Sequence, residues 1–134
     1  MITEQVKNWI KAQAPDYADC IRLGAVDANA EHFLGVFPGN PTGRMHIALG
    51  GTDCTRYDTL YVRLLLRWGK SQVTAEKQAQ ALWRLFYGLT SADMDGATVS
   101  FVDPGSAPVP MGRGGDGVFE YTINLTITYM KEGK

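Results

Sequence analysis

The segment from Val118 to Met130, VFEYTINLTITYM, alternates between apolar and polar side chains along its length. The apolar set comprises Phe119, Tyr121, Ile123, Leu125, Ile127 and Tyr129. The residues between them are Glu120, Thr122, Asn124, Thr126 and Thr128. Successive side chains of a strand point to opposite faces, so this period of two predicts a long strand with its apolar face inward and a Thr-rich face outward. The chain must therefore build a sheet that is covered on one side.

The first half of the chain contains a second strand of this kind, in YDTLYVRLLLRWG from Tyr57 to Gly69. One face of this strand carries Leu60, Val62, Leu64, Leu66 and Trp68. The other face carries Tyr61, Arg63, Leu65 and Arg67. This pattern predicts a central strand with one face in the core and one amphipathic face.

Two segments repeat their apolar residues with the period of a helix. The first stripe is Ile2, Val6, Trp9 and Ile10. The second stripe is Ala75, Ala79, Leu82, Phe86 and Leu89, widened by Trp83 and Leu85. Thr3 and Thr74 are the expected N-caps, and Pro15 is expected to end the first helix. We expect two amphipathic helices, the second lying across the sheet.

Four shorter segments, residues 20–27, 31–39, 45–51 and 97–102, also predict strands, and Gly/Pro-rich residues 38–43 predict a turn. The element order predicts a single α+β domain over residues 1–134. Its mostly antiparallel sheet has about four to five strands, with two helices packed on one face. The segment 97–102 and the last strand are expected to pair as a C-terminal hairpin. Its long loop, residues 103–117, spans about fifteen residues, more than a structural turn requires.

The stretch GRGGDG, Gly112 to Gly117, within that loop matches the pattern G-x-G-x-x-G of nucleotide-binding loops. Such a loop needs a strand before its glycines and a helix after them, whose N-terminal amides face the phosphate. Here a proline-rich segment precedes the glycines and the alternating strand follows them. We therefore expect a turn that finds a protein partner, and a small nucleotide- or small-molecule-binding module remains the alternative.

The positions of cysteine and histidine do not suggest a metal site. Cys20 and Cys54 have neither the C-x-x-C nor any other metal-ligand spacing, so free thiols are expected, with a disulfide as the alternative. His32 and His46 are also too far apart in sequence to form the short-range pairs that nucleate zinc sites. We expect no bound metal.

Neither catalysis nor a cofactor is predicted. No Ser, Cys or Lys stands in a recognisable nucleophile motif. Asp93 and Asp95, in SADMDG, are expected to lie in a solvated turn after the second helix and not to act as paired carboxylates. The protein is expected not to be an enzyme.

Charge and hydropathy exclude two further classes. With 13 basic and 14 acidic residues, the formal net charge is -1, which argues against a dedicated nucleic-acid binder. No segment approaches the roughly 18 consecutive apolar residues of a membrane span, and the N-terminus lacks the features of a signal peptide. We expect a protein that stays in the cytoplasm of the cell that makes it.

Two arginines on the amphipathic face of the 57–69 strand indicate a partner. Arg63 and Arg67 could lay their stems over the sheet with the charged ends in solvent. Alternatively, they pair with carboxylates of a neighbouring subunit. Together with the Thr-rich face of the last strand and the long loop, they favour an assembly protein.

The chain resembles the minor capsid and tail-terminator (tail completion) proteins of tailed bacteriophages. The likeness is carried by the first amphipathic helix, the GVFPG strand end and the stretch GGTDCTRYDTLYVRLLLR from Gly50 to Arg67. The ALWRLF helix and the closing long-looped hairpin complete it. It spans nearly the whole chain and is one of pattern and length, without an invariant motif.

This resemblance implies a subunit of the virion tail or neck, assembled in the host cytoplasm, with no catalytic residues. Copies would form a ring, usually hexameric, that caps the tail tube and docks to the head-tail connector. Genomic DNA would pass through the lumen without being read, and a near-neutral ring suits that passage. The expected contacts with neighbouring subunits or the tube are Arg63, Arg67, Arg113 and Asp116.

Overall fold

A computed structural model describes residues 1–25, 30–39, 57–105, 107–113 and 116–130 of the chain. In chain order, the elements are α1 (Thr3–Gln13), η1 (Pro15–Tyr17), β1 (Ile21–Leu23), β2 (His32–Pro38), β3 (Tyr57–Trp68), α2 (Gln72–Phe86), β4 (Thr90–Met94), β5 (Ala97–Asp103), β6 (Val109–Arg113) and β7 (Phe119–Met130). The strand expected over 45–51 lies outside the described residues.

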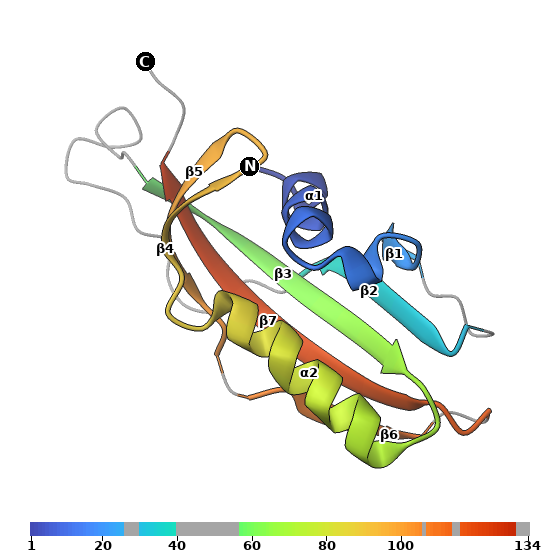
Figure 1. Cartoon of the computed structure of the whole chain (residues 1–134). Coiled ribbons are helices and arrows are strands. Elements are labelled where there is room, and N and C mark those ends of the chain that lie inside the picture. The colour runs from blue at the N-terminus through green and yellow to red at the C-terminus, as the bar shows by residue number, and fades with distance from the viewer. Residues whose placement is uncertain (26–29, 40–56, 106, 114–115, 131–134) are drawn as a thin grey trace.

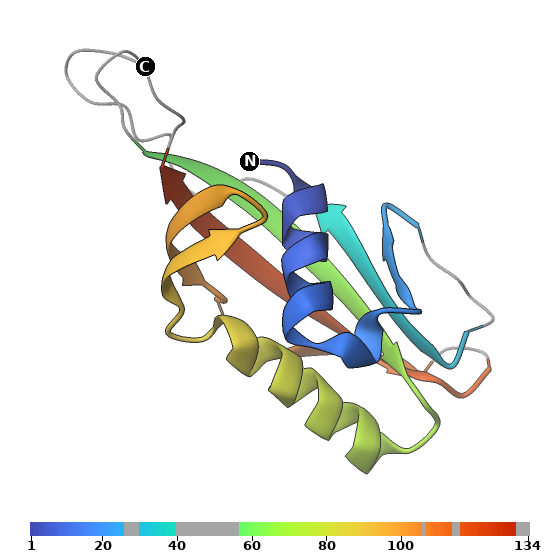
Figure 2. The ribbon, with the colours of Figure 1, turned by 45° about the horizontal axis from the view of Figure 1, so that its top comes forward.

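The strands form one seven-stranded sheet in the order β1-β2-β3-β7-β5-β4, with β6 also paired to β7. Every described pairing is antiparallel except that of β1 with β2. Both helices lie on the same side of this sheet (Figures 1 and 2). The predicted α+β class with a mostly antiparallel sheet is confirmed, although the sheet has more strands than the expected four to five.

The two long strands predicted from their alternation, β3 and β7, are neighbours in the sheet, paired from Tyr57 opposite Met130 to Arg67 opposite Glu120. This register sets the apolar faces side by side, with Leu64 opposite Ile123. Their inward side chains are buried with those of both helices. Because each buried aliphatic side chain contributes roughly 1.5–3 kcal/mol, this register is strongly preferred over a one-residue slip.

The helices differ from the prediction at their first residues. α1 begins at Thr3, so the N-cap position falls on Ile2, whose backbone N–H donates to the Gln5 side chain. α2 begins one turn earlier than expected, because the Ser71 hydroxyl accepts a hydrogen bond from the N–H of Thr74 and caps the helix. Thr74 is therefore inside the first turn of α2.

A hairpin follows α2 where a solvated turn was expected. β4 and β5 pair with Met94 opposite Ala97, so the turn consists of Asp95 and Gly96 alone. Both residues have positive φ, 52° and 91°, as a type I′ turn requires. The turn expected around Asp93 and Asp95 is thus confirmed at Asp95, whereas Asp93 lies in β4.

The region expected as one long loop, residues 103–117, contains a strand. Within it, β6 pairs with the first half of β7, while β5 pairs with the second half along the same side. β5 and β6 thus run one after the other beside β7. The expected pairing of 97–102 with the last strand is confirmed, but the loop between them is a strand and two short connections.

Candidate functional site

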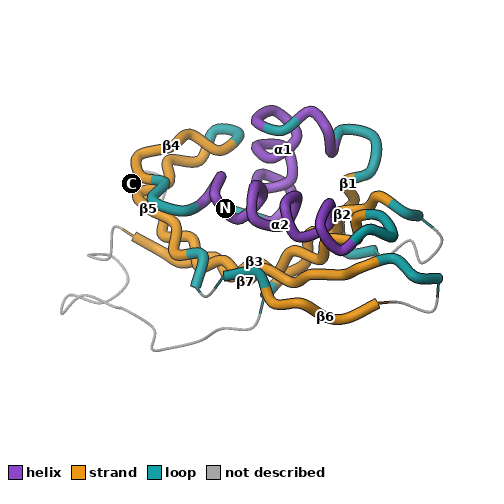
Figure 3. Tube along the Cα trace, turned by 60° about the horizontal axis from the view of Figure 1, so that its bottom comes forward, coloured by secondary structure: helices purple, strands orange, loops and turns teal. Residues whose placement is uncertain are grey.

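No helix that the structure describes lies on the side of the sheet opposite α1 and α2 (Figure 3). We call this side the helix-free face. It carries the alternate residues of the strands: Phe33, Gly35 and Phe37 of β2; Tyr57 to Arg67 at odd numbers of β3; Glu120 to Met130 at even numbers of β7; Phe101 and Asp103 of β5; and Val109 and Met111 of β6.

Exposed apolar side chains gather on the helix-free face. Nine large hydrophobic residues of the described chain are well exposed, and five of them lie here: Tyr57, Phe101, Val109, Met111 and Met130. Scattered exposed hydrophobic residues are ordinary, but a group of them on one uncovered face marks an interaction surface. The predicted outward, Thr-rich face of β7 runs through the middle of this group.

The helix-free face is hollowed between β2, β3, β6 and β7. This sheet hollow has a volume of about 490 Å³ and is lined by Phe37, Arg63, Leu65, Val109, Met111, Thr122 and Asn124. Its walls are mostly apolar, with one cation and two neutral hydrogen-bonding side chains. Such a composition suits a protein partner with an apolar side chain beside an acidic one.

The wall of the sheet hollow on β2 is shaped by Gly35. A Cβ atom at this position would lie 2.6 Å from Cε2 of Phe37 and 3.1 Å from Cε2 of Phe33. The missing side chain therefore lets the two phenylalanine rings lean over the strand from either side. Phe37 in turn lies under the Arg63 guanidinium, whose Cζ atom is 5.6 Å from the ring centroid.

Arg63 is exposed, as its position on the amphipathic face of β3 predicts. In the part of the chain that the structure describes, no carboxylate forms an ion pair with it. The contact between Arg63 and the Phe37 ring agrees with the first of the two predicted alternatives, in which the arginine stem lies over the sheet. Its guanidinium still presents donors to the sheet hollow.

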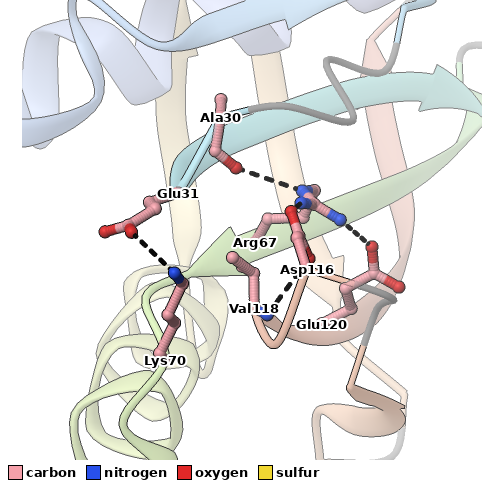
Figure 4. A network of polar contacts seen from close by, with 7 residues as sticks. All are labelled: Ala30, Glu31, Arg67, Lys70, Asp116, Val118 and Glu120. Atoms are coloured by element: carbon pink, nitrogen blue, oxygen red, sulfur yellow. Dashed lines mark hydrogen bonds and ion pairs between the residues drawn. The ribbon is translucent and has the colours of Figure 1, made fainter.

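Arg67 has its partners within its own chain (Figure 4). Although it shares the helix-free face, it is only 3% exposed. Its guanidinium pairs with Asp116 at 2.5 Å and with Glu120, and its Nε donates to the carbonyl of Ala30 at 3.3 Å. We call these four residues the Arg67 cluster. Arg67 and Asp116, expected at a contact with a neighbouring subunit, are thus ion-paired with each other within the chain, and their contact with a neighbour stays a prediction.

The Arg67 cluster holds the turn between β6 and β7 against the end of β3. The Asp116 carboxylate also accepts the N–H of Val118 at 3.1 Å. That backbone hydrogen bond, followed by the bond and charge of Arg67, holds the pKa of Asp116 below its usual value. Phe119 donates its N–H to the carbonyl of Gly69, which closes the same junction. Sequence reasoning missed this cluster because its members are about fifty residues apart.

The GRGGDG stretch does not have the geometry of a phosphate loop. Gly112 and Arg113 end β6, where Arg113 is opposite Phe119, and Gly114 and Gly115 lie outside the described residues. β7 begins at Phe119, so a strand follows Gly117, as predicted. A phosphate loop needs a helix directly after its glycines, and the described chain has β7 there instead, so this order does not favour the alternative of a nucleotide site.

The residues considered as metal ligands are not brought together. His32 stacks on Trp68 with ring centroids 4.2 Å apart, and Cys20 lies before β1. His46 and Cys54 lie outside the described residues. Within the described ranges, no group of three potential ligands from His, Cys, Asp and Glu is close enough to hold an ion. Neither α1 nor α2 has the length and apolar character to cross a membrane.

Comparisons with known proteins add little to this description. No family model and no curated protein matches the sequence. One solved structure, of a protein that carries no descriptive name, is similar over 100% of this chain and 98% of that one, at 14% identity and a TM-score of 0.43. A likeness at that level supports no argument about function.

Proposed function

We propose that this protein is a structural subunit of a bacteriophage virion, a tail-terminator or tail-completion protein. Copies of the subunit form a ring that caps the finished tail tube and offers a docking surface to the neck. The ring acts by binding, without chemistry, and the genome passes through its lumen.

The observation that carries this proposal is the partly apolar helix-free face, over which no described helix lies. A sheet face with five exposed large hydrophobic residues gains from being covered, at about 25 cal/mol for each Å² removed from water. A covering partner also gives the sheet hollow and Arg63 an occupant. The sequence resemblance to tail-terminator proteins suggests which assembly this is. In such a ring, each subunit first binds another copy of itself.

The proposal is tested by mixing the purified subunit with tail tubes assembled from the tube protein of the same phage. Electron microscopy of stained samples is expected to show a ring at one end of each tube, and native mass spectrometry to give its stoichiometry. A subunit that stays monomeric and leaves both tube ends bare contradicts the proposal.

A matched pair of substitutions makes the test specific to the helix-free face. Met111→Lys adds a charge beside the sheet hollow, while Ile2→Lys adds one at the start of α1, and the two side chains are 58% and 59% exposed. Met111→Lys is expected to abolish rings at tube ends, and Ile2→Lys to leave them intact. Equal behaviour of the two variants would remove the helix-free face from the mechanism.

A further inference from the structure

We infer that the sheet hollow of one copy receives the outward side of α2 of a second copy. This inference rests on the proposed function and names the two surfaces that meet. A closed ring needs heterologous contacts, in which two different patches of each subunit meet. The helix-free face supplies the first patch, and the second patch must lie elsewhere on the subunit.

The second patch is the stripe of α2 that points away from the core. We define the α2 outer stripe as Val73, Glu76, Gln80, Arg84 and Tyr87. Val73 and Tyr87 are the two most exposed of the large hydrophobic residues, at 61% and 66%. Tyr87 lies against Trp83, with ring centroids 4.8 Å apart and the ring planes tilted by 34°. This stripe therefore has an apolar group at each end and polar residues between.

The two patches lie on opposite sides of the subunit. In Figure 3, α2 is above the sheet and β6 is below it. If the helix-free face of one copy binds the α2 outer stripe of the next, the copies are joined front to back. Repetition of that contact builds a ring if the rotation closes, which is the geometry that the proposed function requires.

The charges of the helix-free face are spaced along a diagonal of the sheet. Arg63 on β3 is opposite Asn124 of β7, and Asp103 on β5 is opposite Thr126 of the same strand. Two strand spacings and an offset of two residues place the Cα atoms of Arg63 and Asp103 about 12 Å apart. Asp103 is exposed, and one of its oxygens accepts the N–H of Gly105.

The α2 outer stripe has the opposite charges at the same spacing. Glu76 and Arg84 are separated by eight residues of helix, or about 12 Å. Lys77 lies roughly 100° further round the helix from Glu76 and lines the same outward surface as Val73, Glu76 and Arg84. With Glu76 over Arg63, Arg84 falls over Asp103, so a single placement of the helix forms both ion pairs.

The same placement covers apolar groups at both ends of the stripe. Val73, one turn before Glu76, falls over the side of the sheet hollow formed by Phe37 and Leu65. Tyr87, one turn after Arg84, falls toward Phe101 on β5. Charge and apolar patterns therefore agree on one position and one direction of α2 across the face.

The test uses charge reversal in two proteins that are then mixed. Arg63→Glu and Glu76→Arg each place like charges at every contact and are expected to weaken self-association at least about tenfold, as measured by sedimentation velocity. An equimolar mixture can alternate the two proteins around a ring. Every contact in it then joins opposite charges, so the mixture is expected to regain the association of the unmodified protein.

Glu4→Arg reverses an exposed charge in the first turn of α1, outside both patches, and is the control; circular dichroism verifies that each variant is folded. Association of the folded single variants at the unmodified level, or a mixture that stays dissociated, overturns the contact. Unmodified protein that caps tubes while these variants behave normally overturns this contact but leaves the proposed function standing. Failure of the unmodified protein both to self-associate and to cap tubes overturns both.

Discussion

Arg63 and Arg67 are both odd-numbered residues of β3, and yet they have different roles. Arg67 is buried between two carboxylates and a carbonyl, whereas Arg63 lies in solvent over an aromatic ring. The difference comes from what lies opposite each residue on β7. Glu120 faces Arg67, and neutral Asn124 faces Arg63. The position of a residue on the strand therefore determines which face its side chain points to. The residue opposite it on β7 determines whether that side chain is ion-paired within the chain.

Removal of the buried arginine is expected to destabilise the fold. Arg67→Ala leaves Asp116 and Glu120 close together without their cation, and we expect the free energy of unfolding in urea to fall by about 2–3 kcal/mol. Arg63→Ala, on the same face of the same strand, should change it by less than about 1 kcal/mol. A loss at Arg67 no larger than that at Arg63 would show that the Arg67 cluster does not stabilise the subunit.

Tyr17 makes the stability of the protein depend on alkaline pH. Burial raises the pKa of its hydroxyl to about 12, against a weaker opposing effect of the hydrogen bond from Gln78. In the unfolded chain the Tyr17 hydroxyl ionises near pH 10. The free energy of unfolding therefore falls by roughly 2 kcal/mol as the pH rises from about 10 through the pKa of the folded protein. Tyr17→Phe should reduce this loss between pH 10 and 12 in urea titrations, while losing about 1 kcal/mol at neutral pH.

Exposed Tyr87 is the control for Tyr17. Tyr87→Phe keeps the buried hydroxyl and should retain the alkaline loss of the unmodified protein. If Tyr17→Phe retains it as well, the pH dependence arises elsewhere, and Tyr121 and Tyr129, whose pKa values burial also raises, are the groups to vary next.

Among the elements, the β4–β5 hairpin depends on two residues of unusual conformation. Gly96 has a φ of 91°, which an L side chain rarely adopts, although the space around it is open. We expect Gly96→Ala to lower the midpoint of thermal unfolding, with a loss of about 1 kcal/mol from backbone strain alone. Asp95→Gly relieves the positive φ of Asp95 and should be nearly neutral, so equal losses at both positions would point away from the turn.

The sequence predicts elements where one period runs for many residues. The alternation of β3 and β7 and the stripe of α2 each span more than ten residues, and the structure has all three with the expected faces buried. β6 was missed because its five residues, VPMGR, contain a proline and a glycine, which are rare inside strands. β4 was missed because TSADM has little preference for a strand, although the Asp-Gly pair after it is a recognised hairpin turn.

The arrangement of β5 and β6 also changes how the 103–117 region can be altered. Asp103 is opposite Thr126, while Arg113 is opposite Phe119, so the region runs about 24 Å along β7. A two-residue turn in place of residues 106–115 cannot bridge that distance. Shortening this region would pull β5 or β7 out of register, which is a different outcome from removing a loop.

For the molecule as a whole, the inferred contact between copies predicts a dependence on salt. Its two ion pairs form between side chains that are exposed in the free protein, and added salt screens their attraction, with a screening length of about 10 Å at 0.1 M ionic strength. We expect self-association, followed by sedimentation velocity, to weaken as sodium chloride rises. In Arg63→Ala the dependence should be shallower, because one pair has been removed. Association that strengthens with salt in both proteins would indicate a contact made by apolar groups alone.

The site could be anticipated only in part. The amphipathic face of β3 and the Thr-rich face of β7 were visible as alternation, so an uncovered sheet face followed from sequence. The sheet hollow was not, since it needs Phe37, Val109 and Met111 beside β3, and these come from strands whose pairing is set over long distances along the chain. Periodicity gives a residue its face, and only the strand order gives it neighbours.

The central place of β7 has a consequence for how the chain is made. β7 joins β3 on one side to β5 and β6 on the other, and it comes after all of them in the chain. During synthesis, the two parts of the sheet have no connecting strand until residues 119–130 leave the ribosome. The nascent chain therefore cannot complete its core, and interrupted translation products ending before Phe119 would expose it and be open to proteolysis. Only complete chains would fold with a finished surface.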